Sequence, residues 1–226
     1  MLNRQVTKYF SAFWLILISS LPAKACNIAL ALTVDVSGSV NSEEYALQMN
    51  GLAAALRDPT VADALVKEKA SVMLVQWSGT SRQKVVLRWR HIKTREHVEE
   101  LANRVESIPR VWRNFSTAIG DALIFTASHF DEVPQCKRKV IDVSGDGYSN
   151  EGVDPFLIRR EMASRGFTVN GLAIEGSVEK LTQYYLTDVI AGPGAFAMTA
   201  NSFEEYPKRI RQKLLREVSK QIVLLD

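Results

Sequence analysis

The sequence predicts an α/β protein in which helices cover both faces of a mostly parallel sheet. Short apolar runs, typical of strands that are buried on both faces, recur along the chain, and amphipathic segments with helical spacing lie between them. Units that alternate in this order form parallel sheets covered by helices. No repeat, low-complexity segment or linker interrupts the pattern, so we expect one domain over residues 26–226.

Six runs predict the strands. The nearly continuous apolar run IALALTV (28–34) predicts a strand covered on both faces. The next two runs, ASVMLVQW (70–77) and KVVLRW (84–89), are close enough to form a hairpin. Asp142 interrupts the run KVIDVS (139–144). We expect it to be a buried, hydrogen-bonded acid that supports the functional site. The later strands are expected at 139–144 (KVIDVS), 168–174 (TVNGLAI) and 195–199 (AFAMT).

Helices are expected between these strands. The triplet Ser42-Glu43-Glu44 is typical of a helix start, and Tyr45, Met49, Leu52 and Leu56 follow it at helical spacing. The other helices are expected near 94–107, 117–130, 154–165 and 181–190, with a last helix from Phe203.

The N-terminal segment, residues 1–25, has the features of a secretory signal peptide. Basic residues open it, an apolar run over residues 10–21 follows, and Ala23 and Ala25 form an A-x-A cleavage signal before Cys26. The apolar run is shorter than the roughly 18 residues that a membrane anchor needs. We therefore expect a periplasmic or secreted protein without a membrane span after cleavage. Acylation of Cys26, as in a lipoprotein, stays open as an alternative.

The charge balance argues against nucleic acid as a partner. The whole chain has 28 Lys and Arg residues against 25 Asp and Glu residues. The signal segment contains three of the basic residues and no acid, so 28 minus 3 leaves 25 residues of each sign in the mature chain. A nucleic-acid-binding domain normally needs a basic surface. The short basic clusters at 110–113 and 137–139 are instead expected to be solvated loop charges.

The two cysteines are placed to form a disulfide. Cys26 lies nine positions before Asp35, and Cys136 lies ten positions before Asp146. If the two strands are parallel neighbours, both cysteines lie at the same end of the sheet, in an oxidising compartment. We expect a Cys26–Cys136 disulfide. Two unpaired thiols are the alternative, because spacing alone does not fix the geometry.

Polar side chains gather where the first and fourth strands end. Asp35 ends the first strand and Asp146 follows the fourth, so both should face the crevice beyond the carboxyl ends of the strands. Ser37 and Ser39 follow Asp35 in DVSGS, and Thr117 lies in a loop that opens a helix. Two carboxylates and three hydroxyls suit magnesium, with manganese or calcium as alternatives, and argue against zinc or copper. The carboxylates neutralise a divalent ion and leave it able to accept an acidic group from outside.

The pattern of DVSGS, the threonine of NFSTAIGDAL and the aspartate of GDG resembles the metal-ion-dependent adhesion site (MIDAS) of von Willebrand factor type A (VWFA) domains. The resemblance implies a Rossmann-like VWFA fold and a non-catalytic binding function. It implies that the hydroxyls of Ser37, Ser39 and Thr117 contact the ion. Asp35 and Asp146 would bind it directly or through water. A carboxylate presented by a protein or envelope partner would complete the coordination.

The resemblance extends over nearly the whole mature chain to a bacterial group of secreted VWFA-like proteins, classed as domain of unknown function 1194. It rests on LQMNGLAAALRDPTV, VIDVSGDGYSNEG, VNGLAI and YYLTDVIAGPGAF. The chain departs from the broader family at two points. SGDG replaces the commoner threonine before the metal aspartate, and FST replaces a glycine pair before Thr117. Neither change removes a metal ligand, but both are expected to reshape the rim of the site.

The alternative function is a metal-dependent hydrolase, such as a haloacid dehalogenase-like phosphatase with Asp35 as the nucleophile. That chemistry usually needs a second carboxylate two residues later as general acid, where this chain has Ser37. It also leaves Ser39 and Thr117 without a role. A serine hydrolase lacks support because no G-x-S-x-G motif is present and the three histidines fall outside the crevice. We therefore expect a binding module that is not an enzyme.

Overall fold

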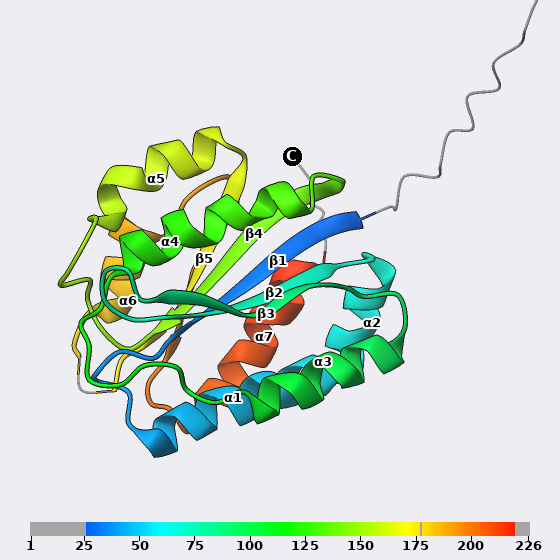
Figure 1. Ribbon diagram of the computed structural model, residues 1–226, viewed down its shortest axis with the longest axis horizontal. Coiled ribbons are helices and arrows are strands. Elements are labelled where there is room, and N and C mark those ends of the chain that lie inside the picture. Colours follow the sequence, from blue (N-terminus) through cyan, green and yellow to red (C-terminus); the bar gives the residue numbers. More distant parts are fainter. Residues whose placement is uncertain (1–25, 177, 220–226) are drawn as a thin grey trace, which may run out of the picture.

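A six-stranded sheet lies at the centre of the protein, in the order β3-β2-β1-β4-β5-β6 (Figure 1). The computed structural model describes residues 26–176 and 178–219. β3 pairs antiparallel with β2, and the ladders that join the other strands are parallel. The strands are β1 (Cys26–Asp35), β2 (Ser71–Trp77), β3 (Gln83–His91), β4 (Cys136–Gly145), β5 (Phe167–Ile174) and β6 (Ala197–Ala200).

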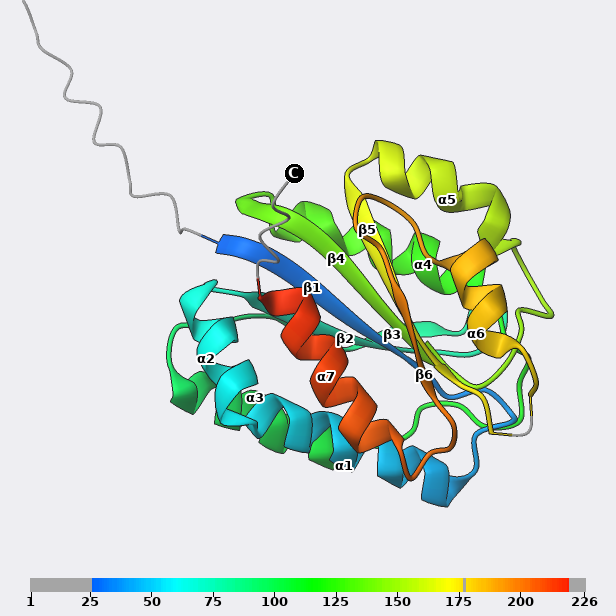
Figure 2. The same ribbon diagram turned by 180° about the vertical axis from the view of Figure 1, so that it is seen from behind.

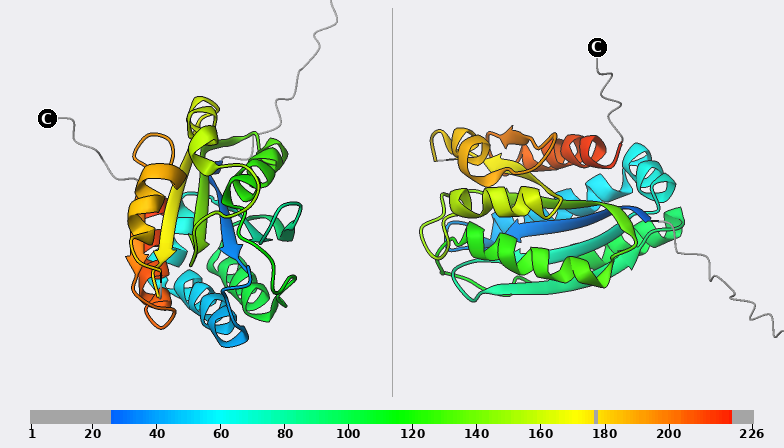
Figure 3. Two further views of the ribbon diagram at one scale, coloured as in Figure 1. Left: turned by 90° about the vertical axis from the view of Figure 1, so that its left-hand side faces the viewer. Right: turned by 90° about the horizontal axis from the view of Figure 1, so that it is seen from above.

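Helices cover both faces of the sheet (Figure 2), and the layers are seen from two further sides in Figure 3. On one face lie α1 (Ser42–Arg57), α2 (Pro59–Lys67), α3 (Arg95–Ser107) and α7 (Tyr206–Val218). On the other face lie α4 (Ile119–Ser128), α5 (Pro155–Ser164) and α6 (Leu181–Tyr184).

β1 shows why the sheet is buried on both faces. Leu30 and Leu32 pack into the core beside α1 and α7, whereas Ala29 and Ala31 face the core beside α4. Successive side chains of a strand point to opposite faces, so a strand between two helical layers needs apolar residues at every position. The continuous apolar run predicted this arrangement, and the expected fold class is confirmed.

The helix expected from Ser42 is followed at once by a second helix that the sequence pattern did not separate. α1 ends at Arg57 and α2 begins at Pro59. Asp58 lies between them, and its carboxylate accepts hydrogen bonds from the backbone N–H groups of Thr60 and Val61 at 3.0 and 3.2 Å. Proline lacks a backbone donor and is favoured in the first turn of a helix, so it starts α2 instead of continuing α1.

Three other helices have different limits from those expected. Segment 117–130 forms α4 and one 3₁₀ turn (His129–Glu132), and segment 181–190 forms α6 and one π-helical turn (Tyr185–Val189). The last helix, α7, begins at Tyr206 instead of Phe203. The late start of α4 leaves Thr117 in the preceding loop.

The strand order reverses at β1 and β4. From β1 the chain moves outward to β2 and β3, returns to β4 on the other side of β1, and then moves outward to β5 and β6. Ligands of such sheets bind beyond the carboxyl ends of the strands at this point. The loops after β1 and β4 meet there, at the left-hand edge of Figure 1.

Cys26 and Cys136 form the expected disulfide at the opposite end of β1 and β4. The two residues are register partners in the parallel ladder, and their Cα atoms are 4.4 Å apart. The bond uses the thiol of Cys26, the same group that acylation would modify. The expected signal peptide, residues 1–25, lies outside the described residues. Within 26–176 and 178–219, no helix has the length and apolarity needed to cross a membrane.

We expect the disulfide to stabilise the fold. It joins residues separated by 110 positions, and loss of a native disulfide from a small exported domain typically costs about 2–5 kcal/mol. Urea unfolding of the oxidised protein, with and without reductant, measures this loss. As a control, reductant should not change the unfolding midpoint of a Cys26→Ala, Cys136→Ala double variant. Equal midpoints for oxidised and reduced wild-type protein would contradict the prediction.

Candidate metal centre

Asp35 is the last residue of β1, and the DVSGS loop turns directly around its side chain. Its Oδ1 atom accepts a hydrogen bond from the backbone N–H of Ser37 at 2.7 Å. The backbone N–H of Gly38 donates to the carbonyl of Phe115 at 2.8 Å and holds the loop from the other side. Asp35 and Ser37 are fully buried, whereas Ser39 is exposed. The loop therefore leads from a buried carboxylate to the surface.

The structure brings all five predicted site residues into one chain of contacts. The Oγ1 atom of Thr117 lies 3.2 Å from Oγ of Ser37, which lies 3.2 Å from Oγ of Ser39. The Ser39 hydroxyl donates to Oδ1 of Asp146 at 2.7 Å. We call Asp35, Ser37, Ser39, Thr117 and Asp146 the oxygen cluster. Their role as metal ligands stays a prediction.

Thr117 is held in the oxygen cluster by the loop that follows β4. Its backbone N–H donates to Oδ1 of Asn150 at 2.9 Å, and its carbonyl accepts from the backbone N–H of Asn150 at 2.9 Å. This pair of bonds joins the loop before α4 to the loop that contains Asp146. Two parts of the oxygen cluster that are distant in sequence are thereby fixed to each other.

Arg110 corrects the expectation that residues 110–113 are solvated loop charges. Its guanidinium donates to the carbonyls of Val36 and Ser37 at 3.0 and 2.7 Å, and it is partly buried. The side chain thus clamps the DVSGS loop from outside the oxygen cluster. Sequence reasoning missed this role because the position lies in an irregular segment, where no periodicity shows which way a side chain points.

Gly145, the last residue of β4, makes room beside Asp35. A Cβ atom at this position would lie 2.8 Å from the hydroxyl of Tyr185 and 3.0 Å from Oδ2 of Asp35. Tyr185 is completely buried. Any larger residue in place of Gly145 would push apart the two groups that approach it, which explains the glycine in GDG.

Burial raises the pKa of both carboxyl groups of the oxygen cluster. Burial, and next the nearby Asp146, raise the pKa of Asp35 to about 8, although hydrogen bonds from Ser37 oppose the shift. Burial also raises the pKa of Asp146, and Glu44 adds to this effect. The positive charge of nearby Arg110 lowers the pKa of both groups but does not outweigh burial.

The residues present fit a divalent ion of the hard, oxygen-preferring kind. Oδ2 of Asp35 is buried without a hydrogen-bond partner, an arrangement that is costly unless a ligand or water compensates it. Across the described part of the chain, no three His, Cys, Asp or Glu side chains gather in a metal-binding arrangement. Three of the five candidate ligands of the oxygen cluster are hydroxyls and two are carboxylates. Oxygen ligands of these kinds suit magnesium, manganese or calcium.

The oxygen cluster opens into a small cavity of about 180 Å³. Ser39 and Asp146 belong to its wall, so a ligand in the cavity reaches the exposed side of the oxygen cluster. The remaining lining residues combine acidic and apolar side chains: Glu44, Ile174, Glu175, Gly176, Val178, Ser202, Phe203 and Glu204.

One family model, described as "Protein of unknown function (DUF1194)", matches residues 25–222 of the chain. No curated protein matches the chain significantly.

Solved structures with this architecture show that the fold is of the von Willebrand factor type A kind. Proximal thread matrix protein 1 from the mussel byssus is 22% identical, and the match covers 84% of this chain and 48% of that one with a TM-score of 0.61. A von Willebrand factor type A protein from Catenulispora acidiphila is 18% identical over 85% of this chain and 43% of that one, with a TM-score of 0.58. The chain spans under half the length of both proteins.

Two further structures extend the comparison. BatB from Bacteroides thetaiotaomicron is 15% identical over 85% of this chain and 98% of that one, with a TM-score of 0.56. Another structure of the mussel protein contains a zinc-occupied MIDAS motif; it is 20% identical over 85% of this chain and 48% of that one, with a TM-score of 0.59.

The raised pKa of Asp35 predicts how the stability of the metal-free protein depends on pH. The folded protein retains a proton on Asp35 that the unfolded chain releases above 3.8, so the contribution of Asp35 to stability is greatest below pH 3.8 and is lost as pH rises to about 8. Thermal unfolding in the presence of a chelator measures this slope. We expect a shallower slope for Asp35→Asn and an unchanged slope for the exposed control Asp131→Asn. Parallel profiles for wild type and Asp35→Asn would contradict the prediction.

Proposed function

The chain belongs to the DUF1194 family, and we propose that it is an exported binding module, not an enzyme, whose oxygen cluster uses a divalent metal ion to bind an acidic group on a protein or envelope partner. The convergence of three hydroxyls and two carboxylates at the strand-order reversal supports this proposal most strongly. Magnesium is the first choice of ion, and manganese or calcium would fit the same donors.

The charge count favours an acidic ligand. Asp35 and Asp146 together neutralise a divalent ion, and the hydroxyls of Ser37, Ser39 and Thr117 contribute no charge. A divalent ion in this cluster would supply a Lewis-acidic centre with affinity for a further carboxylate oxygen. Ser39 is exposed, and the adjoining cavity gives a partner access to this side of the cluster. The ligand therefore has a route to the proposed ion.

The geometry argues against Asp35 as the nucleophile of a phosphatase. Its side chain has no exposed surface, and Ser37 covers it from the loop. A nucleophile needs direct contact with its substrate, and a general acid needs a carboxyl within reach of the leaving group. Ser39 and Thr117, which the phosphatase hypothesis leaves without a role, both contact Ser37 inside the oxygen cluster.

The comparisons support the same proposal. The mussel protein has a zinc-occupied MIDAS motif on a similar fold. We propose that the oxygen cluster is the metal-binding motif of this chain. The buried disulfide supports export, because disulfides persist in oxidising compartments. We propose a periplasmic or secreted location.

Calorimetric titration of magnesium and of manganese into the oxidised, metal-free mature protein tests the proposed site. We expect saturable binding by the wild type and a loss of affinity of at least about 10-fold in Ser37→Ala and in Asp146→Ala, because each substitution removes a proposed ligand. Ser164→Ala and Asp131→Ala change the same residue types at exposed positions and should bind as the wild type does. A folded wild-type protein that binds neither ion would refute the proposal.

A second titration tests whether the bound ion serves a ligand or only the fold. A peptide with one glutamate is compared with its glutamine counterpart, each titrated into magnesium-loaded protein and into metal-free protein. We expect binding of the glutamate peptide to the loaded protein alone. Metal binding without any carboxylate preference would indicate a structural ion.

A further inference from the structure

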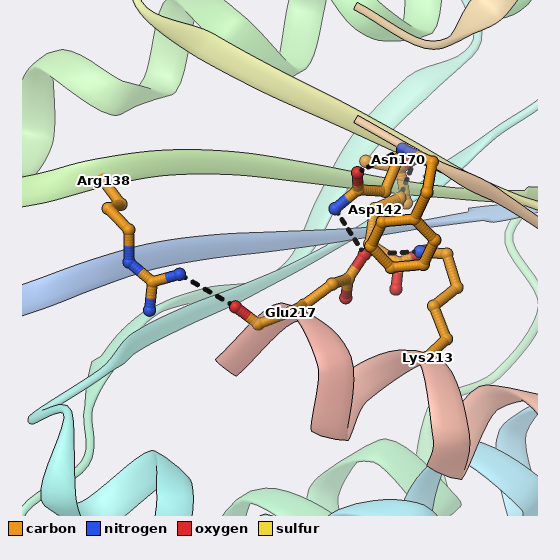
Figure 4. Close-up of polar contacts among 7 residues, drawn as sticks. Arg138, Asp142, Asn170, Lys213 and Glu217 are labelled. Atoms are coloured by element: carbon orange, nitrogen blue, oxygen red, sulfur yellow. Dashed lines mark hydrogen bonds and ion pairs between the residues drawn. The ribbon is translucent and has the colours of Figure 1, made fainter. Parts of the chain in front are cut away.

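A second buried polar cluster lies between α7 and the sheet (Figure 4). Nζ of Lys213 lies 2.6 Å from Oδ1 of Asp142 on β4 and 2.7 Å from Oε1 of Glu217, one turn further along α7. The side chains of Lys213 and Glu217 are 0% exposed and that of Asp142 is 1% exposed. The three reactive groups are thus in contact and shielded from water.

The surroundings hold Glu217 more firmly than Asp142. Oε1 of Glu217 accepts hydrogen bonds from Lys213 and from Nδ2 of Asn170, the latter at 2.9 Å. The Phe196 ring lies 5.9 Å from Nζ of Lys213. Asp142 is buried as expected, and its Oδ1 atom lies at ion-pair distance from Nζ of Lys213. Glu217 is the other group that contacts this carboxyl group. The amine therefore touches the carboxyl group with which it would react.

The cluster contains one cationic group and two carboxyl groups. Burial, and next the nearby Asp142, raise the pKa of Glu217 to about 8, although Lys213 opposes the shift. Glu217 accordingly holds a proton at neutral pH. A condensation needs a free amine and a carboxylic acid, and transfer of one proton from Lys213 to Asp142 within the cluster would supply both.

We propose that Lys213 and Asp142 become joined by an intramolecular amide bond, with Glu217 as the group that transfers the protons. In this step the free-amine form of Lys213 attacks, through Nζ, the carboxyl carbon of the acid form of Asp142, and a new C–N bond forms. Glu217 accepts one proton from the nitrogen and delivers a proton to the departing hydroxyl, so the C–O bond breaks and one water leaves. Glu217 ends in its starting protonation state, and no oxidant, reductant or further reactant is needed.

The structure favours this step in three ways. Contact between the groups replaces a bimolecular encounter, and well-oriented intramolecular reactions reach effective molarities of roughly 10⁵–10⁸ M. A lysine amine in a desolvated site is the form that acts as a nucleophile. The amide also removes a buried ion pair, whose desolvation is costly, and buried surroundings protect the product from water.

The bond would tie the last helix to the centre of the sheet. The disulfide already joins β1 to β4 at one end, and the amide would join β4 to α7. Unlike the disulfide, this link would persist under reducing conditions.

Mass spectrometry of the intact mature protein, denatured and fully reduced, tests the proposal. We expect a mass one water lower than that of the linear sequence, and a proteolytic fragment in which the peptides containing Lys213 and Asp142 are covalently joined. Glu217→Gln keeps the size of the side chain but lacks the acid, so it should have the full mass, as should Lys213→Arg. The exposed i, i+4 pair of Glu161 and Arg165 offers a control, because Glu161→Gln should retain the lower mass.

The wild-type result alone decides the proposal, even if a variant fails to fold. A wild-type protein of full mass would overturn it, and the three residues would then form a buried ion pair with a shared proton. Loss of water that maps to any other pair of residues would also overturn it. The result is independent of metal binding, so it leaves the proposed function untouched in either case.

Discussion

The burial of the Asp35 carboxyl group beside Asp146 is the constraint on which the site depends. Both groups lie at the carboxyl ends of neighbouring parallel strands; Asp35 is fully buried and Asp146 is half-buried. Arg110 lowers the pKa of both groups, but it donates its hydrogen bonds to the carbonyls of Val36 and Ser37. Two poorly solvated acids in this position must either hold protons or share a cation, and the three hydroxyls beside them are oxygen donors suited to the cation.

The surrounding structure keeps this arrangement in place. The Gly38 amide holds the DVSGS loop against Phe115, Asn150 fixes Thr117, and Gly145 leaves space for the Tyr185 hydroxyl next to Asp35. Each of these contacts connects segments that are distant in sequence. The geometry of the site therefore depends on all the loops that meet at this end of the sheet. A second buried acidic group of β4, Asp142, lies away from the oxygen cluster, and there the chain itself supplies the partner, the Lys213 side chain of α7.

Much of this could be predicted from sequence because the signals are local. The alternation of apolar runs and amphipathic segments predicts the sheet, and Asp35, Ser37 and Ser39 lie directly after a strand, where the topology fixes their surroundings. Thr117 and Asp146 follow from the same reasoning at other strand and helix ends. The roles of Arg110, Tyr185 and Lys213 depend on how distant segments pack against each other, and the spacing of residues in the sequence does not indicate this packing. The start of α2 was in principle readable from Asp58, a capping residue, and Pro59 in the first helical turn, but the expected helices did not include this segment.

The central claim is that the oxygen cluster holds a divalent ion. Crystals of the mature protein grown with manganese, measured where manganese scatters anomalously, test it most directly. The account predicts one strong anomalous peak within coordination distance of the Ser37 and Ser39 hydroxyls, lost in crystals of Asp146→Ala grown in the same way. Manganese-containing crystals with an ordered DVSGS loop but no peak between it and Asp146 would contradict the account.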